Sequence, residues 1–369
     1  MYIFITQCFA SRLGGIENLM THFALTLSTK NEVKIFADQH LYVQDQIFDF
    51  ENKSHFNVFR YGGIKILRRY KKANDIKLFI EENKIEGIIA DTWKSLELCI
   101  EEINQAKIPV LCLAHGNELV FNNERKKAKA SKVLNKIPNI VANSKYTAEL
   151  VKSLDINESK IHIVNPGAKD LRSLETKNSY NFTGDPILIT LARLELRKGH
   201  QNVLHSIKKL KDDFPNIQYV IAGEGPERNS LIKLTKDLEI QDHVIFLGEV
   251  NDQQKKEIFE SASLMVMPTS DQIHNRSVEG FGIAYIEAAI FGICSVATNI
   301  GGVSDAIIDG ETGILINSEN DLYDCLNKIL SDKIKLNKLG NQAKERALQR
   351  FSWNLVIEKY LGILKINSY

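Results

Sequence analysis

The segment ILITLARLELRKGHQNVLHSIKKLKDDFPNIQYVIA, from Ile187 to Ala222, predicts a strand, a helix and a second strand in that order. Its strand candidates, Ile187–Ala192 and Gln218–Ala222, are rich in aliphatic residues, as is typical of strands buried on both faces of a parallel sheet. Between them, Gln201–Lys211 has the apolar period of a helix. The same alternation continues along the whole chain and predicts an α/β fold.

The other strand candidates form two sets, one on each side of an interruption. The first set is Tyr2–Thr6, Val33–Phe36, Gly87–Ala90, Val110–Ala114 and Asn139–Ala142, and the second adds Val244–Leu247, Leu264–Met267, Cys294–Thr298 and Gly313–Ile316. Further helices are expected at Pro226–Asp237 and Gln253–Ser261. Between Asn165 and Pro186 the apolar period is lost among Pro, Gly, Asn, Ser and charged residues. We therefore expect a Rossmann-like domain over residues 1–170, a linker over 171–185, a second Rossmann-like domain over 186–352, and an amphipathic helix over about 353–369.

The bulk properties exclude several classes of protein. The chain has 369 residues, 44% of them hydrophobic and 25% charged, which is typical of a soluble globular protein with two domains. The net charge of +1 gives no whole-molecule field that would attract nucleic acid. No apolar run approaches the roughly 20 residues of a spanning helix, and the first residues predict a strand rather than a signal peptide. Five scattered cysteines without a C-x-x-C pair predict neither disulfides nor zinc, and favour the cytoplasm.

The motif ARLELRKGH, at Ala192–His200, places Arg193 after a buried strand and Lys198 before a glycine and a helix. Ligands of open α/β sheets bind at the carboxyl ends of the strands. An arginine that can bind two oxygens and a lysine that acts as a point charge suit a diphosphate. The alternative is a pair of solvated surface cations.

The motif VEGFGIAYIEA, at Val278–Ala288, places Glu279 before a glycine turn and Glu287 inside an expected helix. Glycines at a helix start expose backbone N–H groups to a ligand. A carboxylate within an apolar run is costly to bury, which favours a function for Glu287. A nucleotide sugar could place its phosphate and sugar near Glu279 and its ribose near Glu287. In a chain with 46 acidic residues, a chance pair is the alternative.

Two further features are weaker evidence for a ligand site when each is taken alone. Gly14 and Gly15 precede a helix that begins near Ile16, so backbone N–H groups there could bind phosphate, although a plain strand–turn–helix corner explains them equally well. His115 follows a buried strand, where it could face a ligand or be an ordinary loop histidine.

Together these motifs resemble the retaining glycosyltransferase family with the GT-B fold and an E-x7-E motif, which includes phosphatidylinositol mannosyltransferases and lipopolysaccharide and capsule glycosyltransferases. The resemblance covers nearly the whole chain. The remaining motifs that carry it are GGIE (Gly14–Glu17), HGNEL (His115–Leu119), ANSKYTAELV (Ala142–Val151), VNPGAKD (Val164–Asp170), IAGEGPERNSL (Ile221–Leu231), VIFLGEV (Val244–Val250) and GGVSDAIIDGETGILI (Gly301–Ile316). The loop Pro268–Gly280 is longer and more polar than the shortest family versions, and Ser304-Asp305 stands where Pro-Glu is common.

The resemblance implies a GT-B fold, with two Rossmann-like domains facing a central cleft and a terminal helix that packs back on the first domain. It implies retaining hexose transfer from a nucleotide-diphosphate sugar, UDP favoured over GDP, to a hydroxyl of a glycan or lipid-linked acceptor in cell-envelope synthesis. No cofactor and no metal are expected. The implied catalytic residues are Glu279, Lys198, Arg193 and His115. The implied donor-binding residues are Gly15, Arg193, Lys198, Val250, Phe281, Gly282, Ile283 and Glu287.

Two basic clusters in the first domain suggest contact with an anionic membrane surface at the inner face of the cytoplasmic membrane. They contain Arg60, Lys65, Arg68, Arg69, Lys71 and Lys72 in one, and Arg125, Lys126, Lys127, Lys129, Lys132, Lys136 and Lys145 in the other. Ile64, Leu67 and Tyr70 add an apolar edge, and an ordinary lysine-rich surface is the alternative. The competing functions are a catalytically silent sugar-nucleotide-binding module and another GT-B enzyme, an epimerase, a hydrolase or a phosphorylase.

Overall fold

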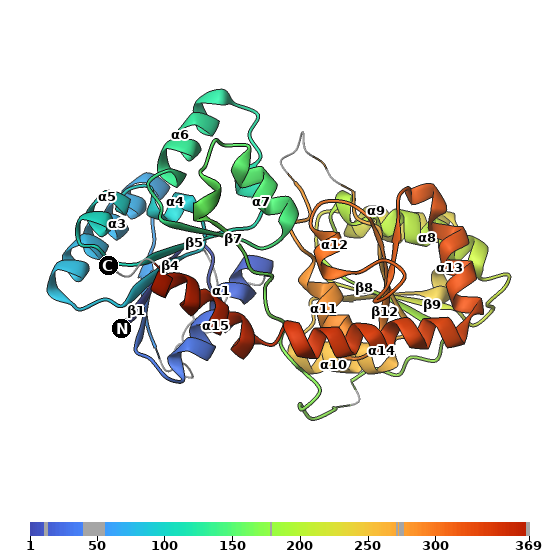
Figure 1. Cartoon of the computed structure of the whole chain (residues 1–369). Coiled ribbons are helices and arrows are strands. Elements are labelled where there is room, and N and C mark those ends of the chain that lie inside the picture. Colours follow the sequence, from blue (N-terminus) through green and yellow to red (C-terminus); the bar gives the residue numbers. More distant parts are fainter. Residues whose placement is uncertain (11–13, 40–55, 178, 271, 273–276, 367–369) are drawn as a thin grey trace. The chain divides into compact units, whose positions relative to one another are not determined.

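The computed structural model describes residues 1–10, 14–39, 56–177, 179–270, 272 and 277–366. The chain divides into two compact units, each built on a parallel sheet (Figure 1). Unit 1 contains Met1–Gly167 and Trp353–Tyr369, and unit 2 contains Ala168–Ser352. The prediction of two Rossmann-like α/β domains is confirmed.

The sheet of unit 1 has the order β3-β2-β1-β4-β5-β6-β7 and every neighbouring pair in it is parallel. Its strands are β1 (Tyr2–Thr6), β2 (Val33–Asp38), β3 (Asn57–Tyr61), β4 (Gly87–Ala90), β5 (Val110–Ala114), β6 (Asn139–Ala142) and β7 (Ile161–Ile163). Its helices are α1 (Gly15–Ser28), α3 (Lys65–Glu82), α4 (Trp93–Leu96), α5 (Ile100–Gln105), α6 (Glu124–Leu134), α7 (Lys145–Lys152) and α15 (Trp353–Ile366). The strand order reverses between β1 and β4, and the crevice at such a point is where α/β sheets bind ligands.

Two apolar layers cover the two faces of this sheet. Helices α3 to α7 pack on one face, and α1 with the carboxyl-terminal helix α15 pack on the other. Phe23 of α1 stacks on Tyr360 of α15 with ring centroids 4.8 Å apart. The terminal helix therefore belongs to unit 1, as the resemblance implied.

The sheet of unit 2 has the order β10-β9-β8-β11-β12-β13 and is also parallel throughout. Its strands are β8 (Ile187–Leu191), β9 (Gln218–Ala222), β10 (Val244–Gly248), β11 (Leu264–Met267), β12 (Cys294–Thr298) and β13 (Ile314–Ile316). Its helices are α8 (His200–Leu210), α9 (Arg228–Asp237), α10 (Asp252–Ser261), α11 (Ile283–Ile290), α12 (Val303–Ala306), α13 (Leu322–Ser331) and α14 (Lys333–Arg350). Helices α8, α9 and α13 pack on one face, and α10, α11 and α12 on the other, while α14 contributes Leu336 and Leu339 to the first layer and Ala343 and Ala347 to the second.

The segment expected to be a linker is fastened to unit 2. Leu171 is buried, and the backbone N–H groups of Lys177 and Ser179 donate to the carboxylate of Glu257 on α10, at 2.9 and 2.6 Å. Lys256 of the same helix donates to the Leu174 carbonyl at 2.6 Å and to Thr176 Oγ1 at 2.8 Å, and Tyr180 and Phe182 pack partly buried against the core of unit 2. These scattered anchors form no apolar period in the sequence. Over the described part of the chain, no helix is both long and apolar enough to cross a membrane.

Candidate functional site

Two glycine-dependent contacts fix the loop that follows β8. The N–H of Ala192 donates to the carbonyl of Ala222 at 3.1 Å, so this loop lies beside the one that follows β9. A Cβ at Gly223 would come within 2.0 Å of the Ala192 carbonyl oxygen, and one at Gly225 within 2.4 Å of the Leu194 carbonyl oxygen. Side chains at these two glycines would therefore separate the loops.

The end of the same loop rests on β11. Gly199 joins the short turn around Lys198 to α8 with a left-handed φ of 71°, and a Cβ there would meet the Pro268 carbonyl oxygen at 2.1 Å. The N–H of Ser270 donates to the Arg197 carbonyl at 2.8 Å. These contacts hold Arg197 and Lys198 beside the carboxyl end of β11. Part of the polar loop Pro268–Gly280, namely 271 and 273–276, lies outside the described residues.

A continuous chain of ion pairs runs through ARLELRKGH and ends on Glu279. Arg193 pairs with Glu195 at 3.1 Å, and Glu195 pairs with Arg197 at 3.3 Å. The Glu279 Oε2 atom accepts from Arg197 Nη1 at 2.8 Å and from Lys198 Nζ at 2.5 Å. The order of pairing is therefore Arg193, Glu195, Arg197, Glu279 and Lys198.

The exposed fraction of the side chains falls along this series of ion pairs. The Arg193 side chain is 66% exposed, whereas those of Lys198 and Glu279 are 11% and 10% exposed. Burial would raise the pKa of Glu279, but Lys198 and Arg197 outweigh it and lower this pKa. Burial lowers the pKa of Lys198, Arg197 adds to this effect, and Glu279 opposes it. The carboxylate is ionised at neutral pH, and the lysine beside it loses its proton more readily than an exposed lysine.

The backbone of Glu279 is held from the opposite side by the glycine pair that precedes α12. The N–H of Gly302 donates to the Glu279 carbonyl at 2.8 Å. Gly301 has a φ of 51°, and a Cβ there would lie 2.3 Å from the same carbonyl oxygen. The GGVSDAI motif thus fixes the position of the glutamate.

Helix α11 begins directly after the glycine turn, as expected. Gly282 is the N-cap residue of α11 and has a left-handed φ of 92°. It offers no side-chain cap, and the first N–H groups of the helix, from Ile283 on, have no intrahelical acceptor. The Phe281 side chain is buried in the core and packs against Phe351. Phe281 can therefore offer a ligand only its backbone.

Glu287 lies one turn into α11 and faces a lysine of α10. Lys255 Nζ contacts Glu287 Oε1 at 3.2 Å, and both side chains are largely buried. Burial would lower the pKa of Lys255, but the Glu287 and Asp252 carboxylates outweigh it and raise this pKa. Val250 lies partly buried between β10 and α10, at the same end of the sheet.

The remaining two predicted residues belong to unit 1. His115 follows β5, and its Nε2 atom lies 2.9 Å from the Asp91 carbonyl oxygen, which follows β4. Its backbone N–H donates to Glu118 Oε1 at 2.7 Å. Gly15 is the first residue of α1, and nothing lies within 4 Å of a Cβ built there.

The geometry adds residues that the sequence reasoning missed. Lys198 and Glu279 were expected to serve one ligand, and the structure places them in direct contact. Glu195, Arg197, Lys255 and Gly301 were not singled out. Arg193, Glu195 and Arg197 place charges of alternating sign at every second position of the motif, and this pattern could have pointed to Glu195 and Arg197. For Lys255 the sequence carries no such signal.

Comparison with known families assigns both halves of the chain. Residues 13–170 match the family model described as Glycosyltransferase Family 4, and residues 173–346 match the one described as Glycosyl transferases group 1. The chain consists of two glycosyltransferase domains. Over 95–98% of its length this glycosyltransferase is homologous to phosphatidylinositol monomannoside mannosyltransferases.

Two of these relatives illustrate the similarity. The GDP-mannose-dependent alpha-(1-6)-phosphatidylinositol monomannoside mannosyltransferase of Mycolicibacterium smegmatis is 23% identical over 95% of this chain and 94% of its own. The GDP-mannose-dependent monoacylated alpha-(1-6)-phosphatidylinositol monomannoside mannosyltransferase of Corynebacterium glutamicum is 23% identical over 98% and 97%. Among solved structures, Anabaena HepE in complex with UDP and glucose is 18% identical, with a TM-score of 0.80 over 99% of this chain and 100% of its own. That likeness shows a shared GT-B fold.

Proposed function

We propose that this glycosyltransferase moves a hexose from a nucleotide-diphosphate sugar to an acceptor hydroxyl, with retention at the anomeric carbon. The observation that carries the proposal is the Lys198–Glu279–Arg197 contact beside the open start of α11. Lys198 and Arg193 would hold the diphosphate and stabilise the charge of the leaving nucleotide, which is electrostatic catalysis by preorganised donors. Glu279 would fix Lys198 and contact the transferred sugar. In unit 1, His115 and Gly15 would contact a substrate of the reaction.

A donor screen tests the proposal directly. The full-length relatives named above are GDP-mannose-dependent, so GDP-mannose is the first donor to test, and the UDP-hexose expected from the sequence is the second. We expect one of them to raise the melting temperature and to be hydrolysed slowly without an acceptor. A retained anomeric configuration in the product, with unchanged turnover in EDTA, would support the retaining, metal-independent mechanism. Binding without any turnover would favour a catalytically silent module, and a released nucleotide-bound epimer would favour an epimerase.

Glu287→Ala is expected to weaken nucleotide binding about 10- to 150-fold, the range of about 1.5–3 kcal/mol for a hydrogen bond to a charged group. The reason is that the Glu287 carboxylate would accept ribose hydroxyls while Lys255 holds its other oxygen. Calorimetry with the nucleoside diphosphate measures the effect, and Glu260→Ala on the exposed side of α10 is the control. Equal affinities of wild type and Glu287→Ala would remove the ribose assignment.

Ion pairs within unit 1 shift the proposed membrane contact from the basic clusters to the apolar edge. In the first basic cluster, Arg68 and Lys72 pair with Asp38, and Arg69 pairs with Glu97, so much of its charge is neutralised. In the second, Lys129 pairs with Glu97 and Lys136 with Glu101. The apolar edge is larger than expected, because four side chains at the start of α3 are more than half exposed: Ile64, Ile66, Leu67 and Tyr70.

We therefore expect vesicle binding to depend on this apolar edge. The double variant Ile66→Gln, Leu67→Gln should reduce flotation with anionic vesicles at low salt several-fold, because it removes apolar surface that would enter the lipid interface. Ile334→Gln, a still more exposed isoleucine of unit 2, is the control. No flotation of the wild type under these conditions would refute membrane docking.

A further inference from the structure

An arginine of α14 binds the carboxyl end of the short helix α12, outside the donor site proposed above. Arg346 Nη1 donates to the Ala306 carbonyl at 2.6 Å, and Arg346 Nη2 donates to the Asp305 carbonyl at 2.7 Å. Both carbonyls belong to the last turn of α12, where a helix leaves carbonyl groups without intrahelical donors. The planar guanidinium serves two neighbouring carbonyls with two nitrogens, a geometry that the single ammonium of lysine does not offer.

Helix α14 is a firm support for this side chain. A Cβ at Gly340 would come within 2.0 Å of the Gly292 carbonyl oxygen, so the backbone of α14 lies directly on the turn that follows α11. Ala343 and Ala347 of α14 are buried in the same apolar layer as α11. Because these small residues bring the two helices close together, Arg346 reaches α12 from a backbone that is packed against α11.

The first route from Arg346 to the donor site runs through α12. Gly302 is the N-cap of this helix, and its N–H donates to the Glu279 carbonyl at 2.8 Å. Arg346 holds the opposite end of the same helix, which is only four residues long (Val303–Ala306). A displacement of α12 would therefore move the Gly302 contact and, with it, the backbone of Glu279.

The second route runs through two aromatic rings. The Arg346 guanidinium lies over the Phe351 ring, with its Cζ atom 4.9 Å from the ring centroid. Phe351 is buried, and its ring centroid lies 5.9 Å from that of Phe281. Phe281 directly precedes Gly282, the N-cap of α11. Arg346 therefore contacts both supports of the segment from Glu279 to Gly282, namely α12 and the aromatic pair.

We propose that Arg346 is a positioning residue, which keeps Glu279 in contact with Lys198 and keeps the first N–H groups of α11 in place for the donor. The assignment rests on the proposed function, in which these groups bind the nucleotide sugar. The hydrogen bonds of Arg346 go to carbonyls of α12, so its effect on the reaction is exerted through the position of Glu279.

The full-length variant Arg346→Met tests the proposal through transfer kinetics and hydrogen exchange. We expect turnover to fall about tenfold or more, and exchange to become about tenfold faster at the Gly302 amide and in the first turn of α11. Arg346→Lys should restore part of both, since an ammonium can still donate to one of the two carbonyls. Arg350→Met removes an exposed cation one turn further along α14, and should leave both within about twofold of the wild type.

The alkaline limb of kcat/KM separates positioning from a general loss of stability. Burial lowers the pKa of Lys198, Glu279 and Glu195 oppose this effect, and Arg197 adds to it. If Glu279 moves away from the ammonium in Arg346→Met, the pKa of Lys198 falls further. The alkaline limb of this variant should therefore lie at lower pH than that of the wild type.

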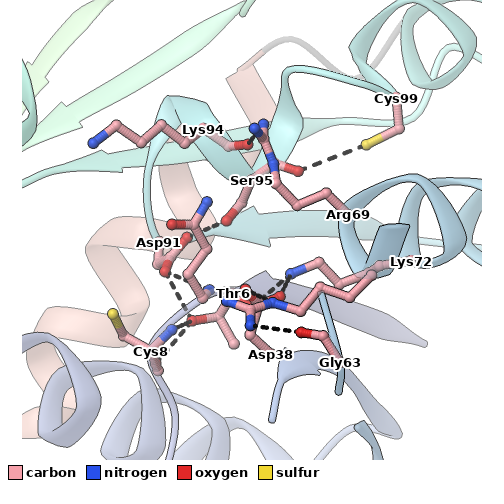
Figure 2. Close-up of polar contacts among 12 residues, drawn as sticks. Thr6, Cys8, Asp38, Gly63, Arg69, Lys72, Asp91, Lys94, Ser95 and Cys99 are labelled. Carbon is pink, nitrogen blue, oxygen red and sulfur yellow. Dashed lines mark hydrogen bonds and ion pairs between the residues drawn. The ribbon is translucent and has the colours of Figure 1, made fainter. Parts of the chain in front are cut away.

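Lys72→Met is the control for a loss of stability that does not involve the donor site. In unit 1, Lys72 is buried, donates to the Thr6 carbonyl at 2.9 Å and pairs with Asp38 at 2.5 Å (Figure 2). Arg68 still pairs with Asp38 in this variant, so the carboxylate keeps a partner. We expect a lower melting temperature, but no movement of the alkaline limb and no faster exchange at the Gly302 amide.

Unchanged exchange at the Gly302 amide in Arg346→Met would overturn the proposal, because the Glu279 backbone would then be held without this arginine. Faster exchange with normal turnover would overturn it too, and so would an alkaline limb that stays in place while Arg346→Met and Lys72→Met lose turnover equally. A wild type that transfers sugar from no nucleotide sugar would refute the proposed function instead. In that case the exchange measurement still decides whether Arg346 holds the Glu279 segment.

Discussion

Lys198→Met is expected to lower sugar transfer about 10²- to 10³-fold, the about 2.7–4 kcal/mol that one preorganised donor supplies to a developing oxyanion. The Lys198 ammonium is buried and fixed by Glu279 at 2.5 Å, so it is in place before the nucleotide leaves. In the proposed mechanism, its attraction for the diphosphate would grow as negative charge develops on the departing oxygen. Nucleotide affinity should therefore fall much less than turnover, because ground-state binding would be shared with Arg193 and backbone N–H groups.

Steady-state kinetics with the donor found in the screen separates these two effects. Lys233→Met, an exposed lysine of α9, controls for loss of one positive charge from unit 2. If Lys198→Met kept near-normal turnover, or lost turnover and nucleotide affinity by the same factor, the proposed role at the leaving group would be wrong.

The pH profile gives a second readout of the same residue. Burial lowers the pKa of Lys198, so the positive charge that the proposed mechanism requires is lost on raising the pH, before an exposed lysine would lose its own. The alkaline limb of kcat/KM should therefore fall below the ordinary lysine range. Lys198→Arg should move this limb upward, because a guanidinium keeps its proton.

The fold could be predicted from the sequence because its strands are buried on both faces. β1, β4 and β9 have the predicted boundaries, since each is an apolar run that ends where a polar loop begins. β3 was missed because it is an edge strand whose first four residues alternate between exposed and half-buried, and whose last residue, Tyr61, is buried. β7 has only three residues, none of them fully buried.

Part of the candidate site could be predicted, because two of its residues lie in motifs that are local in the sequence. Lys198 and Glu279 stood out because a glycine and a helix follow each of them. Their contact spans 81 positions in the sequence and depends on Gly199 against Pro268 and on Gly301 against the Glu279 backbone. Lys255 carries no local signal in a chain with 47 basic residues, and the alternation of Arg193, Glu195 and Arg197 does not identify a partner for Arg197. Only the fold shows that Arg197 and Lys255 face carboxylates.

Glu279→Ala is expected to destabilise unit 2 by about 3–5 kcal/mol, the usual cost of removing one partner from a buried ion pair, and to abolish transfer. Lys198 and Arg197 both contact Glu279 Oε2, so the variant leaves two like charges side by side and largely buried. Hydrogen exchange followed on peptides of β11 and α11 measures the effect locally. Both tryptophans, Trp93 and Trp353, belong to unit 1, so their fluorescence serves as an internal control.

The pH dependence of this loss tests its electrostatic origin. The pKa of Glu279 is lower in the folded than in the unfolded chain, so its contribution to stability is complete above the unfolded pKa and disappears as the pH falls through the folded pKa. The stability difference between wild type and Glu279→Gln should therefore shrink in acid. Adding Lys198→Met to Glu279→Ala should restore part of the lost stability, because one unpaired charge is removed, but none of the activity. If the double variant were as unstable as the sum of the two single variants, Glu279 would contribute through packing rather than by neutralising Lys198.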